Sequence, residues 1–219
     1  MIARASPRPP ARRRKEVRPQ QLLDAALELF VEKGFAATRI EEVARHAGAS
    51  KGTLYLYYPS KEELFKAVVR QNMGKLIGEA GAVAAGAGGR SCTELLRELL
   101  TGWWARVGHS QVGGLHKVML AEVRNFPELA QFYADEVITP ARELFQDLIR
   151  RGIERGEFRR VDVRAATVAV MSPLIFLMLH RHSFGACAVQ GFDVDTDATL
   201  AAHLDLVLTG LQGEVEARR

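Results

Sequence analysis

A short segment from Ser50 to Lys61 concentrates side chains that can bind the base edges and phosphates of DNA. Lys51 and Lys61 supply positive charge, whereas Thr53 and Tyr55 supply hydroxyl groups and an aromatic surface. Groups of these kinds contact phosphate oxygens and base edges in the major groove. The chemistry that this segment predicts is therefore recognition of double-stranded DNA.

A helix-turn-helix would present this segment on a rigid support. Such a motif needs a small residue where its helices touch, a residue that tolerates left-handed backbone at the turn, and an apolar anchor in the second helix. Ala44, Gly48 and Leu54 meet these needs in this order. The second helix is predicted over Ser50 to Tyr58, with its N-terminus entering the major groove.

Two further helices are expected before the recognition helix. Residues 19–34 show helical spacing of apolar side chains, with Pro at the start and Gly at the end, where these residues are favoured. Thr38 and Glu41 then form a predicted capping box for a short helix that ends near His46.

A long fourth helix is expected directly after the recognition helix. Ser60 and Glu63 form a second predicted capping box at its start. Residues 81–89 are nearly all Ala and Gly, which indicates a joint between modules. Residues 18–80 are therefore predicted to form a DNA-binding domain with a linking helix, and residues 90–219 a separate body.

Helical periodicity returns beyond this joint, and no segment shows a convincing strand pattern. Residues 162–179 are apolar nearly all round, as in a helix buried in a core or between two subunits. The predicted fold class is all-α, with a three-helix helix-turn-helix head and a larger helical body. The helices predicted in the body are Thr93–Val107, Val112–Asn125, Glu128–Arg155, Asp162–His182 and Thr196–Leu211.

The distribution of charge also distinguishes two parts. The 219 residues are 47% hydrophobic and 26% charged, which is an ordinary globular balance. The net charge is +4, but residues 1–61 hold twelve Lys and Arg against six Asp and Glu, giving +6, so the remainder sums to −2. A basic first quarter is typical of a nucleic-acid-binding module, and a basic membrane-surface segment is the competing interpretation.

Residues 1–17 are rich in Pro and Arg and are predicted to form a flexible basic arm. The arm lacks the apolar core of a signal peptide. It either follows a flanking minor groove or is a solvated tail. Residues 161–179 contain charged residues and a proline, so they are too polar and too short for a confident membrane span. A soluble cytoplasmic protein without a membrane partner is expected, associated with the nucleoid when bound to DNA.

The remaining reactive residue types predict neither a metal site nor catalysis. Cys92 and Cys187 lie far apart without metal-ligand spacing, and His180 and His182 point to different faces of one helix. The sequence shows no nucleophile elbow, phosphate loop or dinucleotide fingerprint. No cofactor and no enzymatic activity are therefore expected.

The run from Thr38 to Leu64 closely resembles the DNA-binding signature of the TetR family, and the resemblance extends from about Arg18 to Val69. The segment from Ser50 to Tyr55 stands in the register of that family, as do the two adjacent tyrosines that follow. The residues that the resemblance implies at DNA are Lys51, Thr53 and Tyr55 on bases, Tyr57 and Lys61 on phosphates, Thr38 and Arg39 near the backbone, and Ser50 and Gly52 at the helix start.

Two positions depart from the family pattern. Arg39 stands where a second Thr is frequent, and Leu56 stands where a polar or larger aromatic residue is common. Base preference cannot be deduced from single residues, because docking angles differ between proteins. The operator sequence therefore stays open.

The resemblance also implies what the body does. The expected protein is a ligand-responsive transcription regulator, and more specifically a repressor, that binds a palindromic operator as a homodimer. A small apolar or amphipathic effector would release it, and the last two long helices would pair across the two-fold axis. A ligand-independent or architectural DNA-binding protein is the alternative, and a helical enzyme is a more distant one.

An effector site is expected between helices of the body, where apolar cavities often form. Each candidate residue has core packing as its alternative role. The candidates for the cavity wall are Trp103, Trp104, His116, Met119, Phe126, Phe145 and Phe176, with Phe132, Tyr133 and Met178 as further aromatic or sulfur-containing positions.

Overall fold

A computed structural model describes residues 18–86, 88–187, 191 and 193–213. These residues form helices joined by turns, and none of them lies in a strand, as the all-α prediction requires. The predicted arm over residues 1–17 lies outside the described residues.

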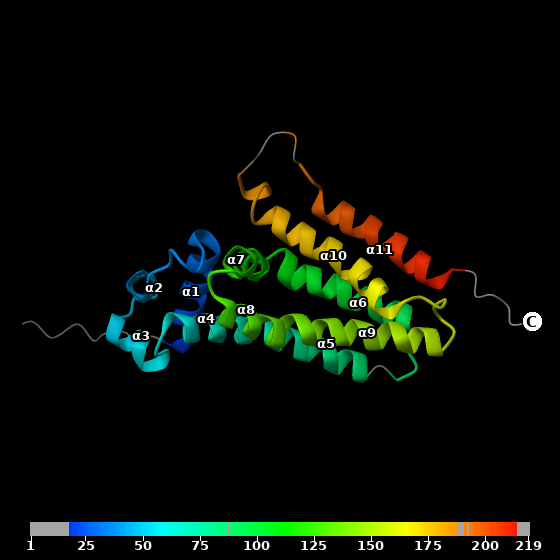
Figure 1. Ribbon diagram of the computed structural model, residues 1–219, viewed down its shortest axis with the longest axis horizontal. Coiled ribbons are helices and arrows are strands. Elements are labelled where there is room, and N and C mark those ends of the chain that lie inside the picture. The colour runs from blue at the N-terminus through cyan, green and yellow to red at the C-terminus, as the bar shows by residue number, and fades with distance from the viewer. Residues whose placement is uncertain (1–17, 87, 188–190, 192, 214–219) are drawn as a thin grey trace, which may run out of the picture.

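The head consists of four helices at one end of the molecule (Figure 1). They are α1 (Pro19–Lys33), α2 (Ile40–His46), α3 (Lys51–Tyr57) and α4 (Lys61–Val69). Gly34 ends α1 with φ +86°, a left-handed conformation that favours glycine, and its N–H bonds to the carbonyl of Phe30.

A helical link joins the head to the body. Helix α4 continues through the wider turn η1 (Arg70–Gly74) into α5 (Lys75–Ala85). The Ala- and Gly-rich segment was expected to form a joint from residue 81, but it stays helical through Ala85 because alanine favours the helix. Helix α5 ends at Ala85, and the next helix begins at Cys92.

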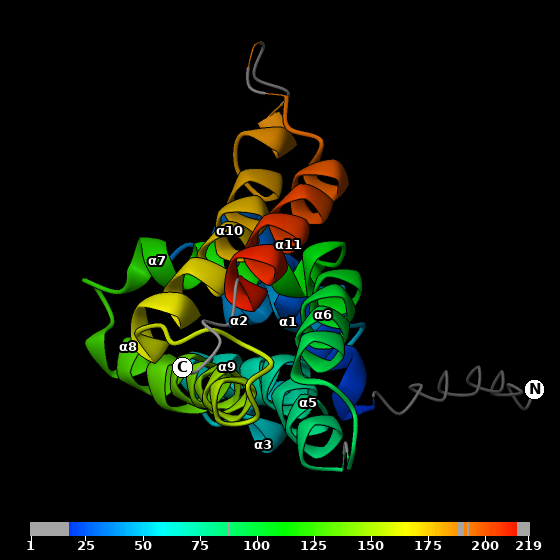
Figure 2. The same cartoon turned by 90° about the vertical axis from the view of Figure 1, so that its right-hand side faces the viewer.

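The five helical segments predicted for the body are all present, and three of them are divided into shorter elements. The elements are α6 (Cys92–Trp103), η2 (Trp104–Gly108), η3 (Gln111–Gly113), α7 (Gly114–Glu122), α8 (Pro127–Tyr133), η4 (Ala134–Ile138), α9 (Thr139–Glu154), α10 (Val163–Arg181), η5 (Gly185–Cys187) and α11 (Thr196–Gln212). Helices α10 and α11 pack side by side on one face of the body, and α5 and α9 form the opposite face (Figures 1 and 2).

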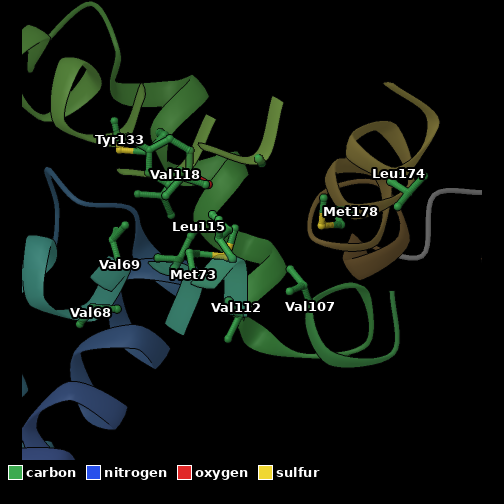
Figure 3. Close-up of a cluster of buried hydrophobic side chains, with 14 of the residues drawn as sticks. Val68, Val69, Met73, Val107, Val112, Leu115, Val118, Tyr133, Leu174 and Met178 are labelled. Atoms are coloured by element: carbon green, nitrogen blue, oxygen red, sulfur yellow. The ribbon is translucent and has the colours of Figure 1, made fainter. Parts of the chain in front are cut away.

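Head and body share one continuous apolar core. Val69 of α4 and Met73 of η1 pack toward Leu115 and Val118 of α7, and Tyr133 of α8 completes the cluster (Figure 3). All five side chains are buried. Because α7 packs against both α1 of the head and α10 of the body, a movement of α7 must be accommodated by the head.

Candidate nucleic-acid interface and body cavity

The recognition helix α3 is fixed to the head by the features that its sequence predicts. Leu54 is fully buried, and Gly48 adopts φ +70° at the turn. The hydroxyl of Ser50 accepts a hydrogen bond from the N–H of Thr53 at 3.1 Å, which caps the helix. Helix α3 therefore has a defined angle and a defined start.

The opposite face of α3 is open to solvent. Tyr55 and Tyr57 are 41% and 47% exposed, and Leu56 between them is 86% exposed. The ammonium of Lys51 lies 2.5 Å from a carboxylate oxygen of Glu41, and this hydrogen bond raises the pKa of Lys51. Both partners are about half exposed, so the ion pair is weak and a phosphate or base acceptor can replace Glu41.

Thr38 has a different role from the one predicted. The N-cap position of α2 is Arg39, and the Thr38 hydroxyl instead donates to the carbonyls of Leu29 and Gly34 at 3.1 and 2.7 Å. Thr38 is 1% exposed, so its side chain is not available to DNA. The predicted capping box is therefore wrong at this position, and Arg39 stays exposed beside it.

Lys61 is also held by the protein. Its ammonium donates to the carbonyls of Phe35, Ala36 and Thr38 at 2.9, 3.1 and 3.2 Å, and lies 4.5 Å from the centroid of the Phe35 ring. These bonds use all three donors of the side chain. Lys61 thus clamps the loop between α1 and α2, and contact with a phosphate would require it to give up one of these bonds.

Ser60 starts α4 as predicted, although the predicted capping box is incomplete. Its hydroxyl accepts from the N–H of Glu63 at 3.1 Å. The Glu63 carboxylate pairs with Lys66 instead of returning to the N-cap, because the two side chains face each other one turn apart.

The body contains a cavity between α5, α6, α7, η4, α9 and α10. It encloses about 680 Å³ of space free of atoms, including its opening to solvent. Of the predicted wall residues, Trp103, His116 and Phe145 line it, together with Met178.

Four of the predicted wall residues lie elsewhere, so their placement in the wall was wrong. The Trp104 indole N–H donates to Asp197 of α11 at 2.7 Å, and Phe126 packs edge-on against Phe35 of the head with centroids 4.8 Å apart. Met119 is buried outside the wall, and Phe176 is 52% exposed on α10.

One polar pair borders the cavity. The hydroxyl of Tyr133 and Nδ1 of His116 are 2.8 Å apart, and the two rings are perpendicular. Burial lowers the pKa of His116 from 6.5 to about 4 and raises the pKa of Tyr133. Both side chains are therefore neutral at pH 7.

A carboxylate contact joins the body to the head. Glu122, the last residue of α7, is buried and accepts a hydrogen bond from the N–H of Ala36 at 2.9 Å. The backbone of α7 also packs directly on α1, since a Cβ at Gly114 would lie 2.4 Å from a methyl group of Val31. Sequence reasoning missed Glu122, because no local pattern marks a helical Glu as buried.

The outer face of α10 and α11 is apolar. Val168 and Phe176 of α10 are 62% and 52% exposed, and Leu206 of α11 is 72% exposed. Residues 163–187 are long and apolar enough to span a membrane by length and composition, and only a third of their most apolar window is buried within the chain. Among the described residues, no group of three or more His, Cys, Asp or Glu side chains is placed to hold a metal ion.

The helical fold with an outward-facing recognition helix defines a helix-turn-helix DNA-binding protein. Residues 22–68 match the sequence model of bacterial regulatory proteins of the tetR family, and residues 90–186 match the tetracyclin repressor-like C-terminal domain. The chain is 31% identical over 203 residues to the HTH-type transcriptional repressor KstR2 of Rhodococcus jostii, covering 90% of this chain and 92% of that protein. The chain belongs to the TetR family of transcription regulators.

Solved structures show the same fold. The fatty acid degradation regulator FadR of Bacillus halodurans superimposes with a TM-score of 0.71 at 22% identity, covering 93% of this chain and 100% of that one. FadR of Bacillus subtilis in complex with stearoyl-CoA gives a TM-score of 0.64 at 20% identity, covering 89% and 100%. At these identities the similarity supports the fold alone.

Proposed function

We propose that the protein is a ligand-responsive repressor that binds a palindromic operator as a homodimer and releases it when a small apolar or amphipathic effector enters the body cavity. One observation carries this proposal: α7 contributes His116 to the cavity wall and Glu122 to the loop that precedes α2. The same helix therefore touches the cavity and the loop that Lys61 of the head holds. Such a repressor acts in the cytoplasm, at the nucleoid.

Helix α3 and the residues next to it would recognise the operator. Lys51, Thr53 and Tyr55 would contact bases, and Tyr57 would contact a phosphate from the exposed end of the helix. Ser50 and Gly52 place backbone N–H groups at the helix start, and Arg39 and Lys61 would approach the DNA backbone. Thr38 is left out of this set because its side chain is buried.

The apolar face of α10 and α11 would form the dimer interface. An exposed apolar surface rimmed by polar residues marks an interaction site in a protein that must stay in water. A two-fold axis along this face would place two copies of α3 about 34 Å apart, in successive major grooves. A palindromic operator follows from that symmetry.

The effector would act through thermodynamic linkage between ligand binding and DNA binding. A ligand weakens DNA binding only if it prefers a conformation that binds DNA poorly. A ligand that displaces His116 along the cavity wall also displaces Glu122 six residues later on the same rigid helix. The loop between α1 and α2 would follow, and with it the orientation of the recognition helix.

The test is binding of the full-length protein to fluorescent DNA fragments selected from a random library and from DNA flanking its coding sequence. The proposal expects one palindromic site that is bound with high affinity and released by compounds that bind the body. Equal binding to all DNA, with steep dependence on salt, would instead support the architectural alternative, because charge alone would then account for binding. High-affinity operator binding that no body ligand affects would overturn the ligand-responsive part alone.

A further inference from the structure

The cavity wall is almost entirely apolar. Fourteen of its fifteen residues are Ala, Val, Ile, Leu, Met, Phe or Trp, and His116 is the single titratable one. The wall contains no Lys or Arg. A carboxylate placed here would lose its hydration without gaining a cationic partner, which costs several kcal/mol. The wall therefore discriminates against anionic ligands.

The hydrogen bond between His116 and Tyr133 defines which nitrogen of the imidazole carries the proton. Tyr133 is 3% exposed, and among the described residues His116 is the only hydrogen-bond partner of its hydroxyl. If Nδ1–H donated to the phenol oxygen, the buried phenol O–H would have no acceptor, at a cost of about 1–3 kcal/mol. Tyr133 therefore donates, Nδ1 accepts, and the proton of the neutral ring resides on Nε2.

The Nε2–H group of His116 is then the donor that the ring offers to the cavity. His116 lies in the interior, yet part of its surface remains accessible, because the ring borders the cavity. Tyr133 is its only hydrogen-bond partner among the described residues. A neutral ring with one free N–H binds an oxygen acceptor and adds no charge.

The groove that adjoins the cavity across Trp103 does not supply the missing cation. Trp103 and Ala80 line both spaces. The groove contains Arg106, whose guanidinium is 2.6 Å from a carboxylate oxygen of Glu79. The groove also contains the carboxylate of Glu98. Glu98 is paired with Arg90 at 2.5 Å, so a highly charged head group would have to displace a carboxylate from one of these two arginines.

We infer that the effector is a neutral, largely apolar molecule with a carbonyl, ester or hydroxyl oxygen that accepts the Nε2–H of His116. The inference rests on the proposed function in assuming that the cavity is the effector site. It excludes free fatty acids and acyl-CoA thioesters as the preferred class. This separates the protein from the relative whose structure contains stearoyl-CoA.

A matched series of probes tests this chemistry: 2-tridecanone, tridecane and tridecanoate, with lauroyl-CoA as the thioester. Binding to the full-length protein at pH 7.5 is measured by calorimetry and by the fluorescence of Trp103 and Trp104, the two tryptophans of the chain. The ketone is expected to bind about tenfold more tightly than the alkane, the equivalent of one hydrogen bond, and more tightly than both anionic probes. Tighter binding of tridecanoate or lauroyl-CoA, or no binding of any probe, would overturn the inference.

Two variants separate a hydrogen bond from mere packing. His116→Phe keeps a ring in the wall but removes the donor, so the preference for ketone over alkane is expected to disappear while alkane binding persists. Tyr133→Phe keeps the donor but removes the group that selects the tautomer, so the preference is expected to shrink and not to vanish. A preference unchanged in His116→Phe would contradict the assignment to His116.

DNA binding is measured separately, so that the two proposals can fail independently. Ketone binding without operator release would overturn the proposed effector action and leave the chemistry of the cavity intact. Operator release by an anionic compound, with no binding of the ketone, would support a ligand-responsive repressor and overturn the inference about its ligand.

Discussion

The two candidate sites of this protein face opposite environments. The head presents α3 outward, with an exposed cation at Lys51 and exposed aromatic rings at Tyr55 and Tyr57. The body encloses an apolar cavity whose titratable wall residue, His116, is kept neutral by burial. Salt screens binding at the first site, and desolvation selects ligands at the second.

The loop between α1 and α2 is where the two environments meet. Lys61 of the head donates to three carbonyls of this loop, and Glu122 of the body accepts from the N–H of Ala36 within it. A short backbone segment is thus held by one charged side chain from each part. In the proposed function, a change at the cavity would reach the head through these oriented backbone groups and would not require like chemistry at the two sites.

The largest expected effect concerns the support of α3 and compares two neighbouring leucines. Leu54→Ala is expected to lower the free energy of unfolding by about 2–5 kcal/mol, because it leaves a cavity beneath the recognition helix. Leu56→Ala, at an 86% exposed position, is expected to change it by less than about 0.5 kcal/mol. Urea denaturation at one protein concentration measures both variants, and equal effects would contradict the placement of α3.

The next largest effect concerns the outward face of the head. Lys51→Ala combined with Tyr55→Ala is expected to weaken binding to the selected operator about 100-fold, since each residue supplies about 1–3 kcal/mol of base discrimination. Fluorescence anisotropy across a salt series measures the loss, and unchanged thermal unfolding shows that the fold persists. Lys75→Ala, on the exposed surface of α5, is the matched control and should bind as the wild type does.

The head could be predicted from sequence in greater detail than the body, for a physical reason. Gly48, Ser50 and Leu54 act through contacts only a few residues away, so their types determine the local geometry. Thr38 failed as a predicted cap because its hydroxyl bonds to carbonyls nine and four residues earlier, and that competition depends on how α1 approaches the loop. The bonds from Lys61 to this loop could not be predicted for the same reason, since its carbonyl partners lie more than twenty residues earlier.

The wall of the cavity, in contrast, could not be predicted from local sequence. Trp103 lines it, whereas Trp104 packs with Asp197 on the far side, although the two residues are adjacent and of the same type. Consecutive side chains on a helix point in directions about 100° apart. The packing of whole helices decides which of these directions faces the cavity. The family resemblance implied an apolar cavity in the body, but the members of its wall are brought together from six elements.

A pH titration sharpens the contrast between the exposed charge of the head and the neutral histidine of the body. The folded-state pKa of His116 is lowered from 6.5 to about 4, so below pH 6.5 the unfolded chain takes up a proton that the folded chain excludes. The contribution of His116 to the free energy of unfolding is therefore fully present above pH 6.5. It decreases as pH falls toward 4, by about 2 kcal/mol between pH 7 and pH 5. Urea denaturation at several pH values measures this slope.

The control for the titration is His116→Phe, which cannot take up the proton. Its stability should depend less steeply on pH over the same interval, whatever its value at pH 7. Burial also lowers the pKa of His182, so that residue contributes a slope of the same sign that remains in the variant. An identical slope in wild type and variant would show that His116 is not held neutral by the cavity wall.

The smallest expected effect concerns the loop that joins the two sites. Glu122→Ala removes the acceptor of the Ala36 N–H, whereas Glu122→Gln keeps an acceptor oxygen and removes only the charge. Hydrogen exchange at Ala36 is expected to accelerate about tenfold in the alanine variant, the equivalent of a hydrogen bond of about 1–1.5 kcal/mol, and to change less in the glutamine variant. Lys61→Met is the matched change on the opposite side of the loop, because it removes bonds to carbonyls and leaves that N–H bonded. If Lys61→Met accelerated exchange at Ala36 as much as Glu122→Ala does, the loop would respond as one unit and Glu122 would not be a separate contact from the body.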